Sequence, residues 1–191
     1  MTALFGILSA FGLSVSAGLN AYIPLLIVGV IAHYTDWIEL NAPYDLMANP
    51  WVLIVIGVLL IVEMLADKVP AVNHINDVIQ TAIRPAAGAV LFAASAEVIT
   101  DVHPVLAIIC GLLVAGSVHG VKAVAVRPAV TATTGGTANV PVSIIEDVIA
   151  TVLSILSIVI PVLIAILLIL FVILVTWWIM ARGARKHRKP E

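Results

Sequence analysis

The chain has 191 residues, of which 62% are hydrophobic and 10% are charged, and its mean hydropathy is +1.20. A soluble domain is about half apolar and about a quarter charged, so composition excludes an ordinary soluble protein and indicates an integral membrane protein. The apolar runs are continuous rather than alternating, which predicts an all-α, polytopic helical membrane protein rather than a barrel of strands. The net charge of −2 conceals a basic end, because five of the nine Lys and Arg residues lie in the last ten positions.

The first apolar run covers residues 3–33, which is longer than the roughly 20 residues that one crossing needs. Ser16, Gly18, Asn20 and Pro24 interrupt it, so we expect one broken or kinked membrane segment. Its middle superficially resembles the end of a signal peptide. It lacks the basic region that begins such a peptide, and we therefore interpret it as the first membrane segment.

Further membrane segments are predicted at 50–67, 85–100 and 104–125, and each of them starts at or beside a proline, as helices often do. The stretch 128–182 is too long for one crossing. We divide it at Ile160-Pro161 into a broken segment, 129–159, and a final span, 161–181, which gives about six crossings. The alternative is a proline kink inside one long helix, with five crossings.

The positive-inside rule fixes the predicted orientation. The basic end must be cytoplasmic, and six crossings then put both termini inside and the acidic loop 34–49 outside. All the remaining basic residues fall inside, namely Lys68, Arg84, Lys122 and Arg127. Residues 68–84 show apolar positions at helical spacing and are predicted to form a short amphipathic helix at the inner interface. The expected organisation is one transmembrane domain, 1–182, followed by a basic cytoplasmic tail, 183–191.

Two short echoes occur within the chain. Arg84-Pro-Ala-Ala-Gly-Ala89 resembles Arg127-Pro-Ala-Val-Thr-Ala132, and Gly18-Leu-Asn-Ala-Tyr-Ile-Pro24 loosely resembles Gly136-Thr-Ala-Asn-Val-Pro141. Two halves of three spans each would have opposite orientations, as in transporters built from inverted repeats. In such proteins the interrupted segments mark the binding site, which makes Asn20 a candidate site residue. The alternative is a chance recurrence of small residues in a sequence rich in Ala and Val.

The most polar stretch between apolar segments is 131–147. Non-helical polar backbone at membrane depth survives only where protein buries it or a watery cavity solvates it, so this stretch is a candidate binding site. Paired glycines allow the backbone to turn and to present amides to an anion or carbonyls to a cation. The candidate ligands from this turn are Thr134, Gly135, Gly136 and Thr137.

Asn139, Ser143 and Asp147 follow at spacing i, i+4 and i+8, so in a continuous helix they share one face, with Glu146 beside it. We expect this face to bind substrate or a coupling ion. The alternative is that Pro141 begins the helix, Asn139 caps it, and the two carboxylates complement its dipole.

The other charged residues lie near the predicted inner side. Glu63 and Asp67, at i and i+4, favour a cation or proton path; alternatively Asp67 and Lys68 lie at the interface and only Glu63 is deep. Arg84 is expected to bind a lipid phosphate or Asp77.

His119, Lys122 and Arg127 are interpreted mainly as structural partners for Glu146 or Asp147 across helices. His74 and Asp77 are a weak metal pair, because two ligands are too few. The single cysteine, Cys110, has no partner for an internal disulfide and is interpreted as packing.

Several of these residues also carry a resemblance. They are Ala66-Asp-Lys-Val-Pro70, Asp77, Arg84-Pro-Ala-Ala-Gly88, Gly136-Thr-Ala-Asn139, Ser143 and Glu146-Asp147. Together with Gly18-Leu-Asn-Ala-Tyr-Ile-Pro-Leu25, they resemble a bacterial family of small multi-pass membrane proteins described only as domain of unknown function 4126. The resemblance implies a bacterial inner-membrane location and singles out the same polar residues. It implies no activity or substrate.

The leading functional hypothesis is a small-solute or ion transporter or channel, without a cofactor and without enzymatic activity, because broken segments and intramembrane carboxylates occur without a catalytic motif. Membrane lipids and a second copy of the chain, in a dimer, are the expected partners, and nucleic acid is not. A lipid or head-group flippase is the first alternative. The others are a membrane enzyme that uses Glu146 and Asp147 or His74 and Asp77, and a scaffold or assembly subunit without flux.

Overall fold

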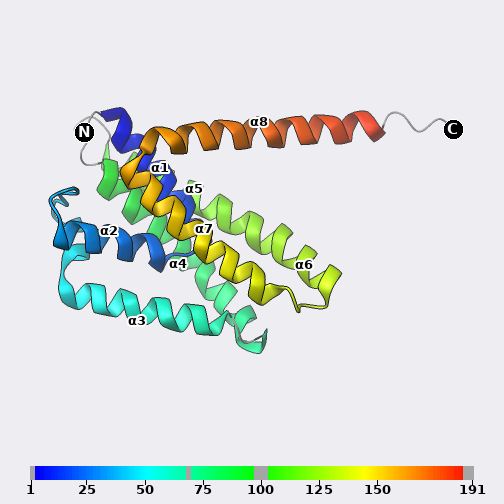
Figure 1. Cartoon of the computed structure of the whole chain (residues 1–191), viewed down its shortest axis with the longest axis horizontal. Helices are drawn as coiled ribbons and strands as arrows, with labels where there is room; N and C mark the ends of the chain where they lie inside the picture. Colours follow the sequence, from blue (N-terminus) through cyan, green and yellow to red (C-terminus); the bar gives the residue numbers. More distant parts are fainter. Residues whose placement is uncertain (1–2, 68–69, 97–102, 187–191) are drawn as a thin grey trace.

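The computed structural model describes residues 3–67, 70–96 and 103–186, and within these ranges every regular element is helical. Figure 1 shows the elements in space. In chain order they are α1 (Ala3–Leu19), α2 (Tyr22–Tyr34), η1 (Tyr44–Ala48), α3 (Pro50–Ala66), α4 (Pro70–Ala96), α5 (Pro104–Val121), η2 (Lys122–Val126), α6 (Arg127–Thr134), α7 (Asn139–Val159) and α8 (Pro161–Lys186).

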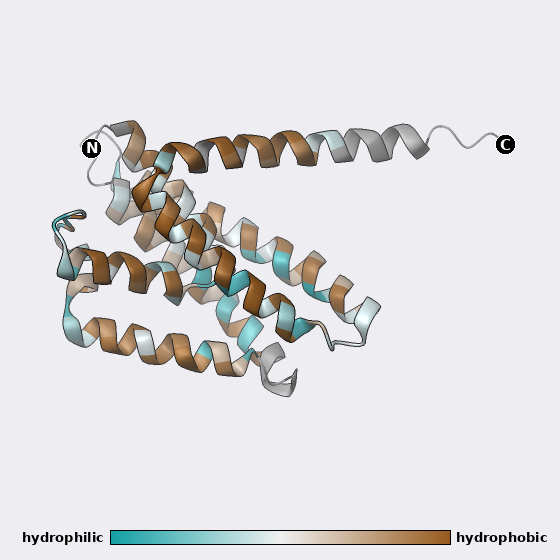
Figure 2. Cartoon of the chain, in the orientation of Figure 1, coloured by the Kyte–Doolittle hydropathy of each residue, from teal (hydrophilic) through white to brown (hydrophobic). Residues whose placement is uncertain are grey.

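The prediction of an all-α, polytopic helical membrane protein is confirmed. In the part of the chain that the structure describes, three stretches are helical, long and apolar enough to cross a membrane: Ile75–Ser95, Pro104–Thr134 and Asn139–Val159. Shorter apolar helices accompany them at Leu4–Leu19, Tyr22–Tyr34 and Pro50–Ala66. Most positions of α2, α3, α7 and the coloured part of α8 are hydrophobic, whereas hydrophilic positions on α4 and α7 lie near the middle of the molecule (Figure 2).

Helix α1 is the central element, since it contacts α4, α5, α7 and α8. Small residues make this possible, and Ala10, Ser14, Ser16 and Ala17 are fully buried. Each buried hydroxyl has an acceptor on a neighbouring helix. Ser14 Oγ donates to the Gly88 carbonyl at 3.0 Å, and Ser16 Oγ donates to the Ala150 carbonyl at 2.7 Å. Small and hydroxylated residues are what close packing between membrane helices favours.

The predicted break in residues 3–33 is confirmed and lies at Asn20. Helix α1 ends at Leu19, α2 begins at Tyr22, and the chain reverses direction between them (Figure 1). The Asn20 side-chain oxygen accepts from the backbone N–H groups of Tyr22, at 3.0 Å, and Ile23, at 3.1 Å. A side-chain oxygen that satisfies free N–H groups at a helix start stabilises that start.

A second confirmed division lies at Pro161. Helix α7 ends at Val159, Ile160 leaves the helical conformation with φ −136° and ψ 69°, and α8 begins at Pro161. Figure 1 shows a turn there, after which α8 extends away from the other helices, so the alternative of a proline kink within one helix is wrong. Helix α8 continues to Lys186, beyond the predicted end at 181.

The predicted boundary between an interfacial helix, 68–84, and a span, 85–100, is wrong. A single helix, α4, runs from Pro70 to Ala96 with Pro85 inside it. Two of its polar residues, Gln80 and Arg84, do not face head groups, because they are buried, with relative exposures of 2% and 1%. Tertiary packing of these side chains keeps the helix continuous through a residue that usually ends one.

The predicted fourth and fifth segments also meet at a different place. Helix continues from Pro104 to Thr134, through a π-helical turn at Lys122–Val126, and the chain breaks only at residues 135–138. The Arg127 N–H bonds the Lys122 carbonyl, five residues back. A π turn widens the helix locally and alters the backbone pairing, so Pro128 is accommodated just after it instead of ending the helix. The predicted start of a separate broken segment at 129 is therefore wrong.

Helices α4 and α5 approach closely at Gly88 and Gly111. A Cβ atom at Gly88 would lie 2.9 Å from the Gly111 carbonyl oxygen and would overlap the Ala115 side chain. A Cβ atom at Gly111 would overlap the Gly88 carbonyl group. This contact brings Arg84, one turn before Gly88, opposite His119, one turn after Ala115.

Candidate functional site

A buried ion pair joins α3 to α4. Arg84 Nη2 lies 2.9 Å from Glu63 Oε1, and both side chains are 1% exposed. The pair continues to α5, where Arg84 Nη1 lies 3.3 Å from His119 Nδ1, and the other ring nitrogen of His119 lies 3.1 Å from Thr81 Oγ1. Arg84 therefore has neither of its predicted partners, Asp77 or a lipid phosphate, because its guanidinium is enclosed by Glu63 and His119.

Asp67 joins α3 to three other helices. Its carboxylate accepts from Ser143 Oγ at 2.7 Å, from Asn76 Nδ2 at 2.9 Å and from Arg127 Nη2 at 3.3 Å. The side chain is buried among these helices. Lys68 lies outside the described residues.

Asp67 directly follows the last apolar turn of α3. The hydrogen bonds from Ser143 and Asn76 and the positive charge of Arg127 all favour the ionised form of its carboxyl group.

Glu146 on α7 pairs with two bases, as the cross-helix interpretation predicted. Lys122 Nζ lies 2.7 Å from Glu146 Oε2, and Arg127 Nη2 lies 3.5 Å from the same oxygen. Lys122 also donates to the Leu19 carbonyl at 3.2 Å, which satisfies a free carbonyl at the end of α1. Asp147 has a different partner, because Asn20 Nδ2 donates to its Oδ1 at 2.9 Å.

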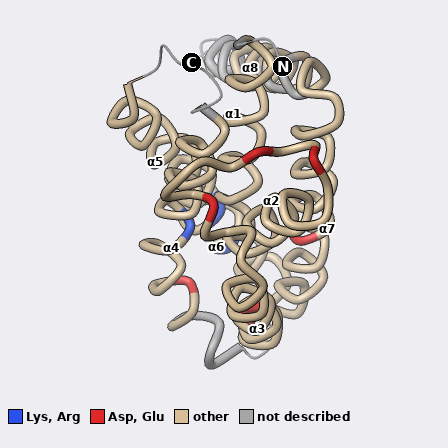
Figure 3. The backbone as a smooth tube through the Cα atoms, turned by 90° about the vertical axis from the view of Figure 1, so that its left-hand side faces the viewer, with Lys and Arg blue, Asp and Glu red and all other residues tan. Residues whose placement is uncertain are grey.

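Four carboxylates of α3 and α7 and three bases lie in the interior and are called here the buried network, although the described contacts divide them into the Glu63–Arg84 pair, a chain from Asp67 through Arg127 and Glu146 to Lys122, and Asp147 with Asn20. The carboxylates are Glu63, Asp67, Glu146 and Asp147, and the bases are Arg84, Lys122 and Arg127. Figure 3 shows the basic positions in the middle of the molecule. Charges removed from water need partners of the opposite sign, and Asp147 is the one carboxylate of the four without a described cation in pairing distance.

A polar cavity of 820 Å³ lies beside the turn between α6 and α7. Its charged lining residues are Asp67, Asp77 and Arg127, and the others with polar side chains are Thr131, Thr137 and Asn139. Gly135 and Gly136, which also line it, have φ of 62° and 89°. Residues other than glycine rarely adopt such φ angles, so both glycines are needed for the turn.

Polar side chains hold this turn together. Asn139 Nδ2 donates to Thr131 Oγ1 at 3.1 Å, and Thr134 Oγ1 accepts from the Ala138 N–H at 3.3 Å. Asn139 makes no cap, because α7 begins at Asn139 itself and the preceding Ala138 provides no side-chain bond. The capping alternative for Asn139 is wrong. Its amide instead joins α6 to α7 across the cavity.

The predicted single face of Asn139, Ser143 and Asp147 is divided among three environments. Asn139 lines the polar cavity, Ser143 is buried against Asp67, and Asp147 lines a separate groove. The three residues do follow one helix, but α6, α3 and α2 pack beside successive turns of it. The substrate or ion role predicted for these residues stays a prediction, as do those of Thr134, Gly135, Gly136, Thr137, Asn20, Glu63 and Glu146.

Sequence reasoning missed a row of polar residues on the first half of α4. Asn76 and Gln80 precede Arg84 at spacing i, i+4 and i+8, and Thr81 lies beside them. Asn76 binds Asp67, Thr81 reaches His119, and Gln80 is buried. Their regular spacing was the available signal, but the prediction of an interfacial helix over 68–84 rested on the apolar positions alone.

The echoed Arg-Pro dipeptides have related contacts. Arg84 pairs with Glu63, and Arg127 pairs with Asp67, one turn along α3. The other echo has no such match, since Asn20 caps a helix and Asn139 does not.

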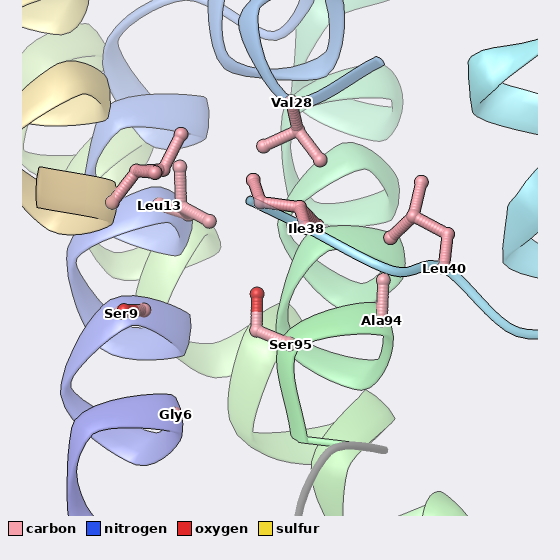
Figure 4. Close-up of a pocket in the computed structure, with 9 residues that line it drawn as sticks. Gly6, Ser9, Leu13, Val28, Ile38, Leu40, Ala94 and Ser95 are labelled. Atoms are coloured by element: carbon pink, nitrogen blue, oxygen red, sulfur yellow. The ribbon is translucent and has the colours of Figure 1, made fainter. Parts of the chain in front are cut away.

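A second cavity, of 50 Å³, lies where α1, α2 and α4 meet the segment after α2 (Figure 4). Leu13, Val28, Ile38 and Leu40 form apolar walls. The Ser9 hydroxyl at its edge already donates to the Ser157 carbonyl at 2.6 Å. Its lining contains no charged side chain, so this cavity offers no chemistry comparable with the polar one.

Among the described side chains, no three His, Cys, Asp or Glu residues converge as metal ligands. The side chain of His74, one half of the weak metal pair, lies outside the described residues.

Comparison with known proteins gives one match. A family model described as Domain of unknown function (DUF4126) matches residues 7–181. No curated protein and no solved structure matches the chain.

Proposed function

The chain belongs to the family described as Domain of unknown function (DUF4126), and from its site we propose that it moves a small polar solute or ion across the bacterial inner membrane. The observation that supports this function is the 820 Å³ cavity at the α6–α7 break. Pockets of about 300–1,000 Å³ hold small molecules, and breaks in membrane helices are where transporters place their sites.

The lining fits a polar substrate. The Thr131 hydroxyl and the Asn139 amide offer donors and acceptors, and Asp77 and the Asp67–Arg127 pair offer charge of both signs. The network behind this pair continues through Glu146 to Lys122. We propose that substrate binding at the cavity competes with the 3.3 Å Asp67–Arg127 contact, so that the network rearranges as substrate passes.

The same proposal includes an orientation and an assembly. A cytoplasmic C-terminal end puts the Lys and Arg residues inside, and in that orientation the α6–α7 cavity lies near the inner surface. A homodimer would surround the exposed faces of a small bundle and provide room for a path. No cofactor and no covalent chemistry are required.

A lipid or head-group flippase is less well supported. In that alternative Arg84, Lys122 and Arg127 would hold a phosphate, but each of them already contacts a buried carboxylate. A scaffold without flux would need no cavity with a charged lining.

Flux into liposomes tests the proposal. Reconstituted protein is expected to admit labelled sodium, chloride or glycine faster than empty liposomes do. Asn139→Ala and Thr131→Val remove polar groups from the cavity without unpairing a buried charge, and each is expected to lower the flux about tenfold. Asp45→Asn, on the exposed η1 segment, is the matched control and should leave it unchanged. Equal flux in the cavity variants and the parent protein would contradict the assigned site.

A further inference from the structure

A groove of 440 Å³ lies between α2, α3 and α7, farther along α7 than the polar cavity. Eight of its ten lining residues are apolar, among them Ile23, Leu60, Met64, Ile144 and Val148. The other two are Asp147 and Thr151. One carboxylate therefore stands in a wall of otherwise hydrocarbon character.

None of the described cations lies within salt-bridge distance of this carboxylate. Of the three bases in the buried network, Arg84 pairs with Glu63, and Lys122 and Arg127 pair with Glu146 and Asp67. Asp147 receives only the neutral amide of Asn20, at Oδ1. No described residue donates a hydrogen bond to its other oxygen, Oδ2. A carboxylate in apolar surroundings attracts a cation strongly, because little water screens the charge.

The groove is unsuited to a bare metal ion. Calcium takes six to eight oxygen ligands, and magnesium about six, whereas the groove offers the Asp147 carboxylate, the Thr151 hydroxyl and hydrocarbon. The Thr151 hydroxyl already donates to the Asp147 carbonyl at 2.8 Å. A ligand that fits must carry its own apolar surface for the walls and a single positive charge for the carboxylate.

We propose that the α2–α3–α7 groove binds a monovalent organic cation with an apolar body. The charge of the ligand lies against Asp147, and its hydrocarbon replaces water or lipid along Ile144, Val148 and Leu60. Asn20 holds the carboxylate in place from the α1–α2 break. This site is separate from the cavity at the α6–α7 turn and does not depend on the transport proposal.

Binding of tetraphenylphosphonium to the detergent-purified protein tests the site, with its neutral analogue triphenylphosphine oxide as the matched probe. The parent protein should bind the cation, and Asp147→Asn should weaken that binding about tenfold or more. The Asn side chain retains an oxygen for the bond from Asn20, so this variant removes charge with little change of shape. Asp147→Glu keeps the charge and should retain binding, and Asp77→Asn, in the polar cavity, should not affect it.

A second variant covers the case in which Asp147→Asn does not fold. Ile144 is 48% exposed on the groove side of α7, so Ile144→Trp fills the groove without disturbing the buried network and should abolish binding. The proposal is overturned if the parent protein does not bind the cation, or if neither Asp147→Asn nor Ile144→Trp weakens binding. Equal affinity for the neutral probe would identify a groove for acyl chains instead.

Discussion

Arg84 and Glu63 form an ion pair at 2.9 Å with both side chains 1% exposed, although they are separated by 21 positions and lie on different helices. The pair fixes the relative rotation of α3 and α4, and through His119 it also fixes α5. Buried pairs of this kind are costly to break on one side only.

Replacing one member of this pair should therefore destabilise the protein more than the loss of the ion pair alone would. Glu63→Gln or Arg84→Met alone is expected to lower the free energy of unfolding by about 3–5 kcal/mol, because the remaining group is left in the protein interior without its partner. The double variant should lose less than the sum of the two. Unfolding in mixed detergent micelles measures these values, and additive losses would show that the two residues act independently. Glu39→Gln, on an exposed loop, is the control and should stay within about 0.5 kcal/mol of the parent.

The close approach of α4 and α5 predicts that Gly→Ala substitutions will differ in their effect on stability. Gly88→Ala and Gly111→Ala should each destabilise the protein by about 1–3 kcal/mol, since the added methyl group meets backbone of the facing helix. Gly57→Ala and Gly120→Ala place the same methyl group where nothing lies within 4 Å. Thermal unfolding of the four variants compares them, and these two controls should match or exceed the stability of the parent because alanine favours helix. Equal effects at all four positions would contradict the described packing.

The hydrogen bond between Asn20 and Asp147 predicts that exchanging the two residues restores the stability lost in a single variant. Asn20→Asp keeps an oxygen that caps α2, but it sets two carboxylates at hydrogen-bond distance and should cost about 2 kcal/mol or more. Combining it with Asp147→Asn restores one amide and one carboxylate in the opposite order, so most of the loss should be recovered. Thermal unfolding of the two single variants and the double variant checks this. A double variant no more stable than Asn20→Asp alone would mean that the two side chains do not interact.

The orientation predicted from charge can be tested with single cysteines. In a Cys110→Ala background, a cysteine at Asp45 should react with an impermeant maleimide added to intact cells, and one at Arg185 should react only after the membrane is opened. Cys110 is partly buried in α5, so its replacement by a smaller apolar residue is conservative. Labelling of both positions from outside would contradict the proposed orientation and would require an even number of crossings between Asp45 and Arg185.

Local side-chain chemistry made some features predictable. The breaks at Asn20 and Ile160-Pro161 follow from residues whose own side chains cap, turn or interrupt a helix. The boundaries at Arg84-Pro85 and Arg127-Pro128 were predicted wrongly by the same logic. Proline inside α4 and beside the π turn is tolerated because packing against neighbouring helices keeps the chain helical. The local sequence does not show which helices will pack there.

The sequence alone determined the membrane class, the helical fold and the set of intramembrane charges, because these depend on composition and on short-range spacing. It also placed Glu63 and Asp67 on one face of one helix. Only the tertiary structure decided that Arg84 pairs with Glu63 and Arg127 pairs with Asp67. It also decided that Asp147 lines an apolar groove. The physical reason is that an ion pair depends on the distance between helices. That distance is set by contacts such as Gly88 with Gly111, which lie far from the charges in the sequence and carry no charge themselves.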